Sequence, residues 1–179
     1  MIIKDDKIEI RRFTNYEYHT FWRNYIPDGL VDNKYYIYNK EKVDISFKKN
    51  EKNRERNKVV GIFNTEGFPI GIISFKKMDY IKQQCEIELM MVNNKYKDRG
   101  FGSAAFRLCV EHIFNELQFK NIFIHIMSEN RVMQYIALKN NFCLVSTDKD
   151  YYNLNGKKQD RLSYKRTNTL KQLYENNIL

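Results

Sequence analysis

The sequence contains few cysteines, which form disulfides, and few prolines and glycines, which interrupt helices and strands. Among 179 residues there are two prolines, seven glycines and three cysteines. Cys85, Cys109 and Cys143 are odd in number, far apart and set in apolar segments, and none belongs to a CxxC or Cys/His pattern. This spacing argues against a disulfide framework and a metal centre, and it favours buried free thiols.

Long apolar runs are also missing. No stretch approaches the ~20 apolar residues that a membrane-spanning helix needs, and residues 1–6 lack the apolar centre of a signal peptide. We therefore expect a cytoplasmic protein without a membrane segment. The length suits one domain, and 13 Tyr with 12 Phe are enough for an aromatic-rich core.

The formal net charge of +9 is unevenly distributed. Residues 34–58 contain nine Lys/Arg against four Asp/Glu, and residues 148–171 contain seven against three, so these two basic segments account for the whole excess. Such segments predict a surface that attracts acidic partners, RNA or a polyphosphate ligand. A solvated exterior that binds nothing explains them equally well.

Apolar periodicity predicts a single mixed sheet with helices. The early strands form antiparallel hairpins, and a strand–helix–strand unit follows in which the continuous apolar strand at 122–127 fits burial on both faces, as in parallel sheets. We expect six to seven strands in a domain over residues 1–166, then a helical tail over 167–179. The predicted strands are 8–13, 59–63, 69–75, 85–92, 122–127, 143–146 and 161–165, and the predicted helices are 15–25, 42–52, 103–117 and 130–140.

The segment Lys97-Asp98-Arg99-Gly100-Phe101-Gly102 has the character of a phosphate-binding loop. It lies between the strand at 85–92 and a helix that opens near Ser103. Glycines let backbone N–H groups approach an anion, and a helix N-terminus adds about half a positive charge. The segment matches neither the dinucleotide-binding GxGxxG pattern nor the P-loop pattern GxxxxGK[ST].

The same segment resembles the [RQ]-x-x-G-x-[GA] signature of GCN5-related N-acetyltransferases, the GNAT superfamily. Several further motifs of that superfamily occur in the same order between Ile8 and Arg166, and together they look closest to its ribosomal-protein and polyamine N-acetyltransferase branch. They are a helix with Trp22, Pro69-Ile70-Gly71, Cys85-Glu86-Ile87-Glu88, Ser128-Glu129-Asn130 and Asn141-Phe142.

This resemblance implies the α+β GNAT fold and acetyl-CoA as the acetyl donor, with no metal. It also implies which residues bind the coenzyme. The backbone of Met90, Met91 and Val92 would meet the pantetheine arm where two parallel strands separate, and Asn130 would lie beside it. The pyrophosphate would lie on Lys97, Asp98, Arg99, Gly100, Phe101, Gly102 and Ser103.

The sequence departs from the family pattern at three positions. Lys97 replaces the usual Arg or Gln, which keeps a cation but loses the planar guanidinium fork. Asn141 replaces a Gly before Phe142, and Asn also tolerates positive φ. Ala137 stands where many members carry a catalytic Tyr, and Tyr135, two residues earlier, points elsewhere on a helix.

Glu86 and Glu88 are the candidate catalytic residues. Residues two apart on a strand share one face, so both carboxylates can bind or deprotonate an amine next to the thioester. The alternative is an ordinary solvated sheet face. The histidines His19, His112 and His125 lie on predicted helices or a buried strand, which favours structural roles.

We therefore expect an enzyme that transfers acetyl from acetyl-CoA to a primary amine by direct attack. The amine is a small molecule, a polyamine, or a protein N-terminus or lysine, and the sequence leaves these open, along with a monomeric or homodimeric state. The rival interpretation is a non-catalytic acyl-CoA-binding or RNA-associated module, motivated by Ala137 and the basic segments. A nucleic-acid partner is disfavoured because no RNP-type aromatic motif is present.

Overall fold

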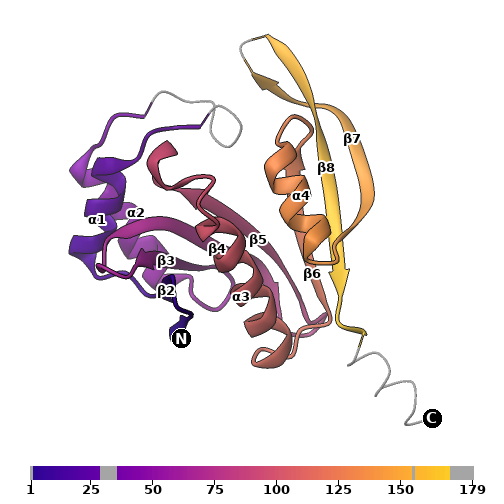
Figure 1. The fold of residues 1–179 in the computed structure, drawn as a ribbon, viewed down its shortest axis with the longest axis horizontal. Helices are drawn as coiled ribbons and strands as arrows, with labels where there is room; N and C mark the ends of the chain where they lie inside the picture. Colours follow the sequence, from indigo (N-terminus) through magenta and orange to yellow (C-terminus); the bar gives the residue numbers. More distant parts are fainter. Residues whose placement is uncertain (1, 29–35, 155, 170–179) are drawn as a thin grey trace.

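A computed structural model describes residues 2–28, 36–154 and 156–169. Its strands form one mixed sheet in the order β1-β2-β3-β4-β5-β6-β8-β7, with helices packed on both faces (Figure 1). The strands are β1 Ile2–Lys4, β2 Ile8–Arg11, β3 Lys58–Asn64, β4 Pro69–Asp79, β5 Gln84–Met91, β6 Asn121–Met127, β7 Cys143–Leu154 and β8 Lys157–Thr167. The helices are α1 Asn15–Asn24, α2 Lys40–Lys52, α3 Phe101–Asn115 and α4 Arg131–Lys139, with a short 3₁₀ turn η1 at Asn94–Tyr96.

The α+β class and the mixed sheet are confirmed, but the sheet has eight strands rather than six or seven. The additional strand is β1, which is three residues long, pairs only with β2 and so left no periodic pattern in the sequence. The predicted tail helix falls mainly on residues 170–179, outside the described residues, so the domain boundary at 166 stays a prediction.

The last two strands are far longer than predicted. They form a hairpin that projects past α4 (Figure 1). Nearly every residue of β7 is exposed or half-buried, so the hairpin shows no apolar alternation, and only its base was found from the sequence. Of its predicted turn, Asn155 lies outside the described residues, and Gly156 has φ +84°.

Two hydrophobic cores lie on opposite faces of the sheet. On one face α3 and α4 cover the strands, with Phe106, Cys109 and Ile113 of α3 fully buried. On the other face α1 and α2 cover a separate aromatic cluster around Phe21 and Phe63. Alternate strand residues supply the two cores, as a pleated sheet covered on both faces requires.

The cysteines are free, as expected, but only two are buried. Burial raises the pKa of Cys85 to about 12 and also raises the pKa of Cys109, so both thiols stay protonated at neutral pH. The expectation of burial was wrong for Cys143, which is exposed at the start of β7. It begins an exposed edge strand, although the surrounding sequence is apolar.

The buried imidazole of His19 links α1 to α2. Its Nδ1 lies 2.8 Å from the Tyr38 hydroxyl, and its Nε2 lies 2.9 Å from Asp44 Oδ1. Both ring nitrogens of a side chain that is 4% exposed therefore have partners, which is how a buried polar group avoids a desolvation penalty. The structural role expected for His19 is confirmed.

The β5–β6 pair is the parallel pair that the sequence predicts, and it is short. Its register runs from Gln84↔Asn121 to Glu86↔Phe123. Beyond these three pairs β5 pairs only with β4, and β6 pairs only with β8, and both pairings are antiparallel. The expectation that β6 is buried on both faces was wrong: its residues alternate between buried and half-buried, because the second face borders a cleft.

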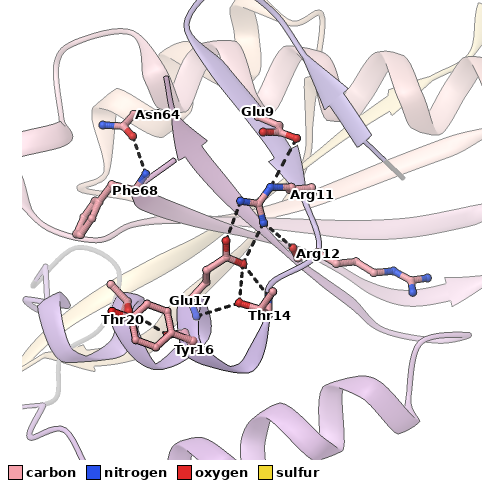
Figure 2. A network of polar contacts seen from close by, with 9 residues as sticks. All are labelled: Glu9, Arg11, Arg12, Thr14, Tyr16, Glu17, Thr20, Asn64 and Phe68. Carbon is pink, nitrogen blue, oxygen red and sulfur yellow. Dashed lines mark hydrogen bonds and ion pairs between the residues drawn. The ribbon is translucent and has the colours of Figure 1, made fainter. Parts of the chain in front are cut away.

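A charged network fixes the entry to α1 (Figure 2). Thr14 and Glu17 form a capping box, in which the Thr14 hydroxyl accepts from Glu17 N–H and the Glu17 carboxylate accepts from Thr14 N–H. Arg11 of β2 donates to both Glu17 carboxylate oxygens, at 3.0 and 2.8 Å. The hydrogen bond from Arg11 lowers the pKa of Glu17.

Replacing Glu17 by Gln should lower the free energy of unfolding by about 2 kcal/mol at pH 7, because a charge-assisted bidentate bond is lost. The folded-state pKa of Glu17 lies below its unfolded value, so this stabilisation is complete above about pH 4.3 and is lost as the pH falls through the folded value. Urea unfolding at pH 7 and pH 3 should show a larger difference between the two proteins at pH 7 than at pH 3. Glu55→Gln, at an exposed carboxylate, is the matched control, and an equal loss in both variants would contradict this account.

Candidate active site

A cleft of about 360 Å³ opens where β5 and β6 separate. Its floor comes from the facing parts of β4, β5 and β6, one end is bordered by the start of α4, and Tyr152 reaches it from the long hairpin. The lining residues are Ile72, Ser74, Ile87, Glu88, Leu89, Met90, Ile124, His125, Ile126, Met127, Asn130, Met133 and Tyr152.

Residues 97–103, named the phosphate loop after their predicted role, follow η1 and run into the first turn of α3. Asp98 and Gly100 have positive φ, +55° and +80°, and Gly100 is the N-cap of α3 without any side-chain cap. The other described α-helices are capped by Thr14, Asn39 and Asn130. No acidic residue lies in the first turn of α3, so its first N–H groups are left without a protein anion.

The N-terminus of α3 lies against the end of β5. A Cβ atom added at Gly102 would lie 3.3 Å from Leu89 Cδ2 and 3.6 Å from Met91 Sδ. Leu89 also lines the cleft, so one side chain contacts both the start of α3 and the cleft. The absence of a side chain at Gly102 lets the start of α3 pack this closely against β5.

Two cations belong to the phosphate loop. The Lys97 ammonium pairs with Asp28, which follows α1, so this loop is tied to the helix on the opposite face of the sheet. The Arg99 guanidinium lies 5.3 Å from the centre of the Phe101 ring and is exposed. Arg99 is therefore the cation with more freedom to meet an added anion.

The pairing of β4 with β5 decides which backbone groups face the gap. Val92 N–H donates to the Ile70 carbonyl, and the Val92 carbonyl accepts from Ile26 N–H. Alternate residues of an antiparallel strand bond to the same neighbour, so Met90 also turns its backbone towards β4. Leu89 and Met91 turn theirs towards β6. Leu89 was missed because this alternation needs the register, which the sequence does not show.

The amide of Asn130 caps α4. Its Oδ1 accepts from Met133 N–H at 3.0 Å, and the residue borders the cleft. Ser128, two residues before, accepts from Asp160 N–H and donates to Gln159 Oε1 at 2.9 Å. The turn that brings α4 to the cleft is therefore tied to the long hairpin, and a coenzyme contact of Asn130 stays a prediction.

Glu86 and Glu88 share a face of β5, as predicted, but their surroundings differ. Glu88 lines the cleft, is 60% exposed at its side chain and pairs with Lys76. The Glu86 side chain is 19% exposed, and its Oε1 lies 2.8 Å from Lys77 Nζ and 3.3 Å from His125 Nε2. Glu88 and His125 therefore line the cleft, whereas Glu86 is not among its lining residues and contacts His125 instead.

His125 belongs to the cleft rather than to the core. Its Nδ1 lies 2.8 Å from Ser163 Oγ, and its side chain is 28% exposed. The sequence interpretation favoured a structural role because the surrounding strand is so apolar. The alternation of residues along β6 indicates that His125 lies outside the core. Ile122, Ile124 and Ile126 lie on the buried face, so His125 lies on the other face.

Comparison with known families decides the class. The Acetyltransferase (GNAT) domain family matches residues 7–142. The chain belongs to this family. A search among curated proteins found no match.

Solved GNAT structures share the fold. One is a ribosomal L7/L12 α-N-protein acetyltransferase in complex with coenzyme A, with a TM-score of 0.82 and 19% identity over 93% of this chain and 98% of that one. Another is a dodecameric spermidine N-acetyltransferase from Vibrio cholerae, with a TM-score of 0.76 and 14% identity over 92% and 96%. At these identities the likeness establishes the fold.

The GNAT tyrosine position is filled by a core residue in this chain. Ala137 is fully buried on the inner face of α4. Tyr135 is 63% exposed, and the Lys139 ammonium lies 6.0 Å from its ring centre. Tyr135 therefore cannot take over the position of Ala137, as the sequence already indicated.

Among the described residues, no group of three or more His, Cys, Asp or Glu side chains could hold a metal ion. No helix in this part of the chain is long and apolar enough to cross a membrane.

Replacing Asn130 by Ala should destabilise the protein by about 1 kcal/mol, because the first turn of α4 loses its side-chain acceptor. Asn130→Asp keeps an oxygen at the same place and should unfold close to wild type in urea. Equal unfolding of the Ala variant and wild type would show that this cap contributes nothing to stability.

Proposed function

We propose that this GNAT protein transfers acetyl from acetyl-CoA to a primary amine bound in the cleft between β5 and β6. One observation carries the proposal: the uncapped N-terminus of α3, with left-handed residues at Asp98 and Gly100, adjoins that cleft. A helix N-terminus suited to phosphate therefore lies next to a cleft suited to an extended chain. Coenzyme A contains both groups, a pyrophosphate and an extended pantetheine arm.

The phosphate loop would hold the pyrophosphate mainly through backbone N–H groups of residues 98–103. Since the Asp98 side chain is an anion, only its backbone suits this role, and the exposed guanidinium of Arg99 supplies a cation within the loop. The pantetheine would run along the free backbone edge of Leu89 and Met91, past Asn130. Acetyl-CoA supplies the activated acyl group. The solved neighbour in complex with coenzyme A supports this assignment.

The acceptor would approach from the α1–α2 face, where Glu88 borders the cleft. A half-solvated carboxylate there can attract an ammonium group, and the neutral amine can then attack the thioester carbonyl. Lys76 and Lys77 already neutralise the two carboxylates of β5. The cleft is therefore only weakly acidic, which favours a single amine over a polycation.

The RNA-associated alternative loses part of its motivation in the structure. In the second basic segment Lys149, Lys158 and Arg161 pair with Asp160, Asp150 and Asp148, and Lys157 pairs with Glu129. These pairs place carboxylates beside four of the cations, which lowers the local positive potential that would attract a phosphate backbone, while the segment keeps its surplus of four positive charges.

Release of free thiol from acetyl-CoA should follow addition of an amine. A suitable panel contains a short peptide with a free N-terminus, a lysine peptide with a blocked N-terminus, spermidine, an aminoglycoside and an amino sugar. The peptides or another monoamine should give turnover that saturates in acetyl-CoA. Binding of acetyl-CoA with no turnover on any amine of the panel would contradict the proposed reaction.

Arg99→Glu should raise the KM for acetyl-CoA about tenfold, since it places a negative charge beside the pyrophosphate position. The effect should shrink at high ionic strength, because Arg99 is exposed. Lys82→Glu makes the same charge change in the turn at the opposite end of β5 and should leave the KM unchanged. Equal effects of the two variants would show that the phosphate loop has no special part in binding.

A further inference from the structure

We infer that the outer face of α2 binds an acidic segment of a partner polypeptide. This surface, the α2 lysine face, consists of Ile45, Lys48, Lys49 and Lys52, which are all exposed. It shares no lining residue with the cleft between β5 and β6. The inference therefore goes beyond the proposed acetyl transfer and does not depend on it.

A shallow groove runs along the α2 lysine face. It has a volume of about 310 Å³ and is lined by the four residues of this face together with Asn53. Residues three, four and seven positions after Ile45 lie on the same side of a helix, so the three lysines follow it in one stripe. The stripe is about 10 Å long, at 1.5 Å per residue, which is enough for a short segment of another chain.

The three lysines of this face form no ion pair with any of the described residues, whereas the acidic residues of α2 lie at its start or have other partners. Glu41 lies in the first turn, at the far end of the helix. Asp44 Oδ1 lies 2.9 Å from His19 Nε2, and Glu51 pairs with Arg54. No close carboxylate therefore offsets the positive charge of the α2 lysine face.

The opposite side of α2 is firmly attached to α1. The rings of Phe47 and Tyr18 lie 5.5 Å apart between centres, and Val43 is 5% exposed. The Tyr18 hydroxyl lies 3.0 Å from Ser46 Oγ and accepts from Asn50 Nδ2 at 3.1 Å. Because these contacts fix the helix, a partner of the α2 lysine face does not have to order it first.

The helix dipole accounts for only part of this arrangement. Lys49 and Lys52 lie in the last turn of α2, where cations are favourable. The dipole does not explain why Ile45, which is 66% exposed, lines the same groove. An apolar side chain beside three cations matches a partner that has both apolar and acidic side chains.

The chemistry of the α2 lysine face favours a polypeptide over RNA or a second copy of the chain. Carboxylates four residues apart on a helix, or two apart on an extended segment, match lysines that are one turn apart. The face has no aromatic ring and no arginine, which are the groups on which unpaired bases stack. A second copy is disfavoured because each chain has a formal net charge of +9.

Binding of a defined peptide to the intact protein tests the inference. The probe is a labelled peptide with a blocked N-terminus and no lysine, in which glutamates spaced four residues apart alternate with leucines. A matched peptide has glutamine in place of each glutamate. The glutamate peptide should bind about tenfold more tightly at low salt, and the difference should shrink as the ionic strength rises. Equal binding of the two peptides, or no binding of the glutamate peptide, would overturn the inference.

Variants of the protein test whether the α2 lysine face is the site. Lys48→Gln combined with Lys52→Gln should weaken binding of the glutamate peptide about fivefold. Ile45→Ser should weaken it about threefold without changing the salt dependence. Lys82→Gln combined with Lys139→Gln, at exposed lysines of other elements, is the matched control and should leave binding unchanged. Thermal unfolding of all variants should stay close to wild type, and an equal loss of binding in the two double variants would overturn the inference.

Amide NMR locates the bound peptide and separates the two classes of partner. The glutamate peptide should shift the backbone N–H signals of α2 and leave those of the β7–β8 hairpin in place. A single-stranded RNA of equal charge should bind less tightly and without preference for α2. Peptide shifts confined to the hairpin, or tighter binding of the RNA at α2, would overturn the inference.

Discussion

The site depends on the separation of β5 from β6 soon after the two strands begin. These strands share only three register pairs, while each keeps a long antiparallel partner on its other side. The sheet therefore stays continuous at one end and opens at the other. Backbone groups on the open edges lack ladder partners, and buried groups of this kind need other partners. A ligand with amide groups along an extended arm suits such an edge.

Each remaining part of the site takes its place from this opening. The β5 strand runs out towards the phosphate loop, so the α3 N-terminus lies at the end of the gap. Separation of the strands also exposes the cleft face of β6, which turns His125 from an apparent core residue into a cleft residue. The long hairpin, tied to the start of α4 through Ser128, brings Tyr152 to the same place.

The sequence predicted the backbone of the phosphate loop better than the surroundings of the cleft. Phosphate binding depends on local features, namely glycines, positive φ and the start of a helix. These features can be recognised within a segment of six residues. The shared face of Glu86 and Glu88 followed from strand periodicity alone. By contrast, the cleft positions of Leu89 and His125 depend on which neighbour each strand edge meets, and that is a property of the pairing. The length of β7 was hidden because its side chains are solvated and follow no apolar pattern.

A crystal structure with coenzyme A tests the central claim most directly. The account predicts the pantetheine between β5 and β6, bonded to the backbone of Leu89 and Met91, with the pyrophosphate on the N–H groups that open α3. Coenzyme A ordered elsewhere on the protein, with the gap between β5 and β6 empty at saturating concentration, would contradict it.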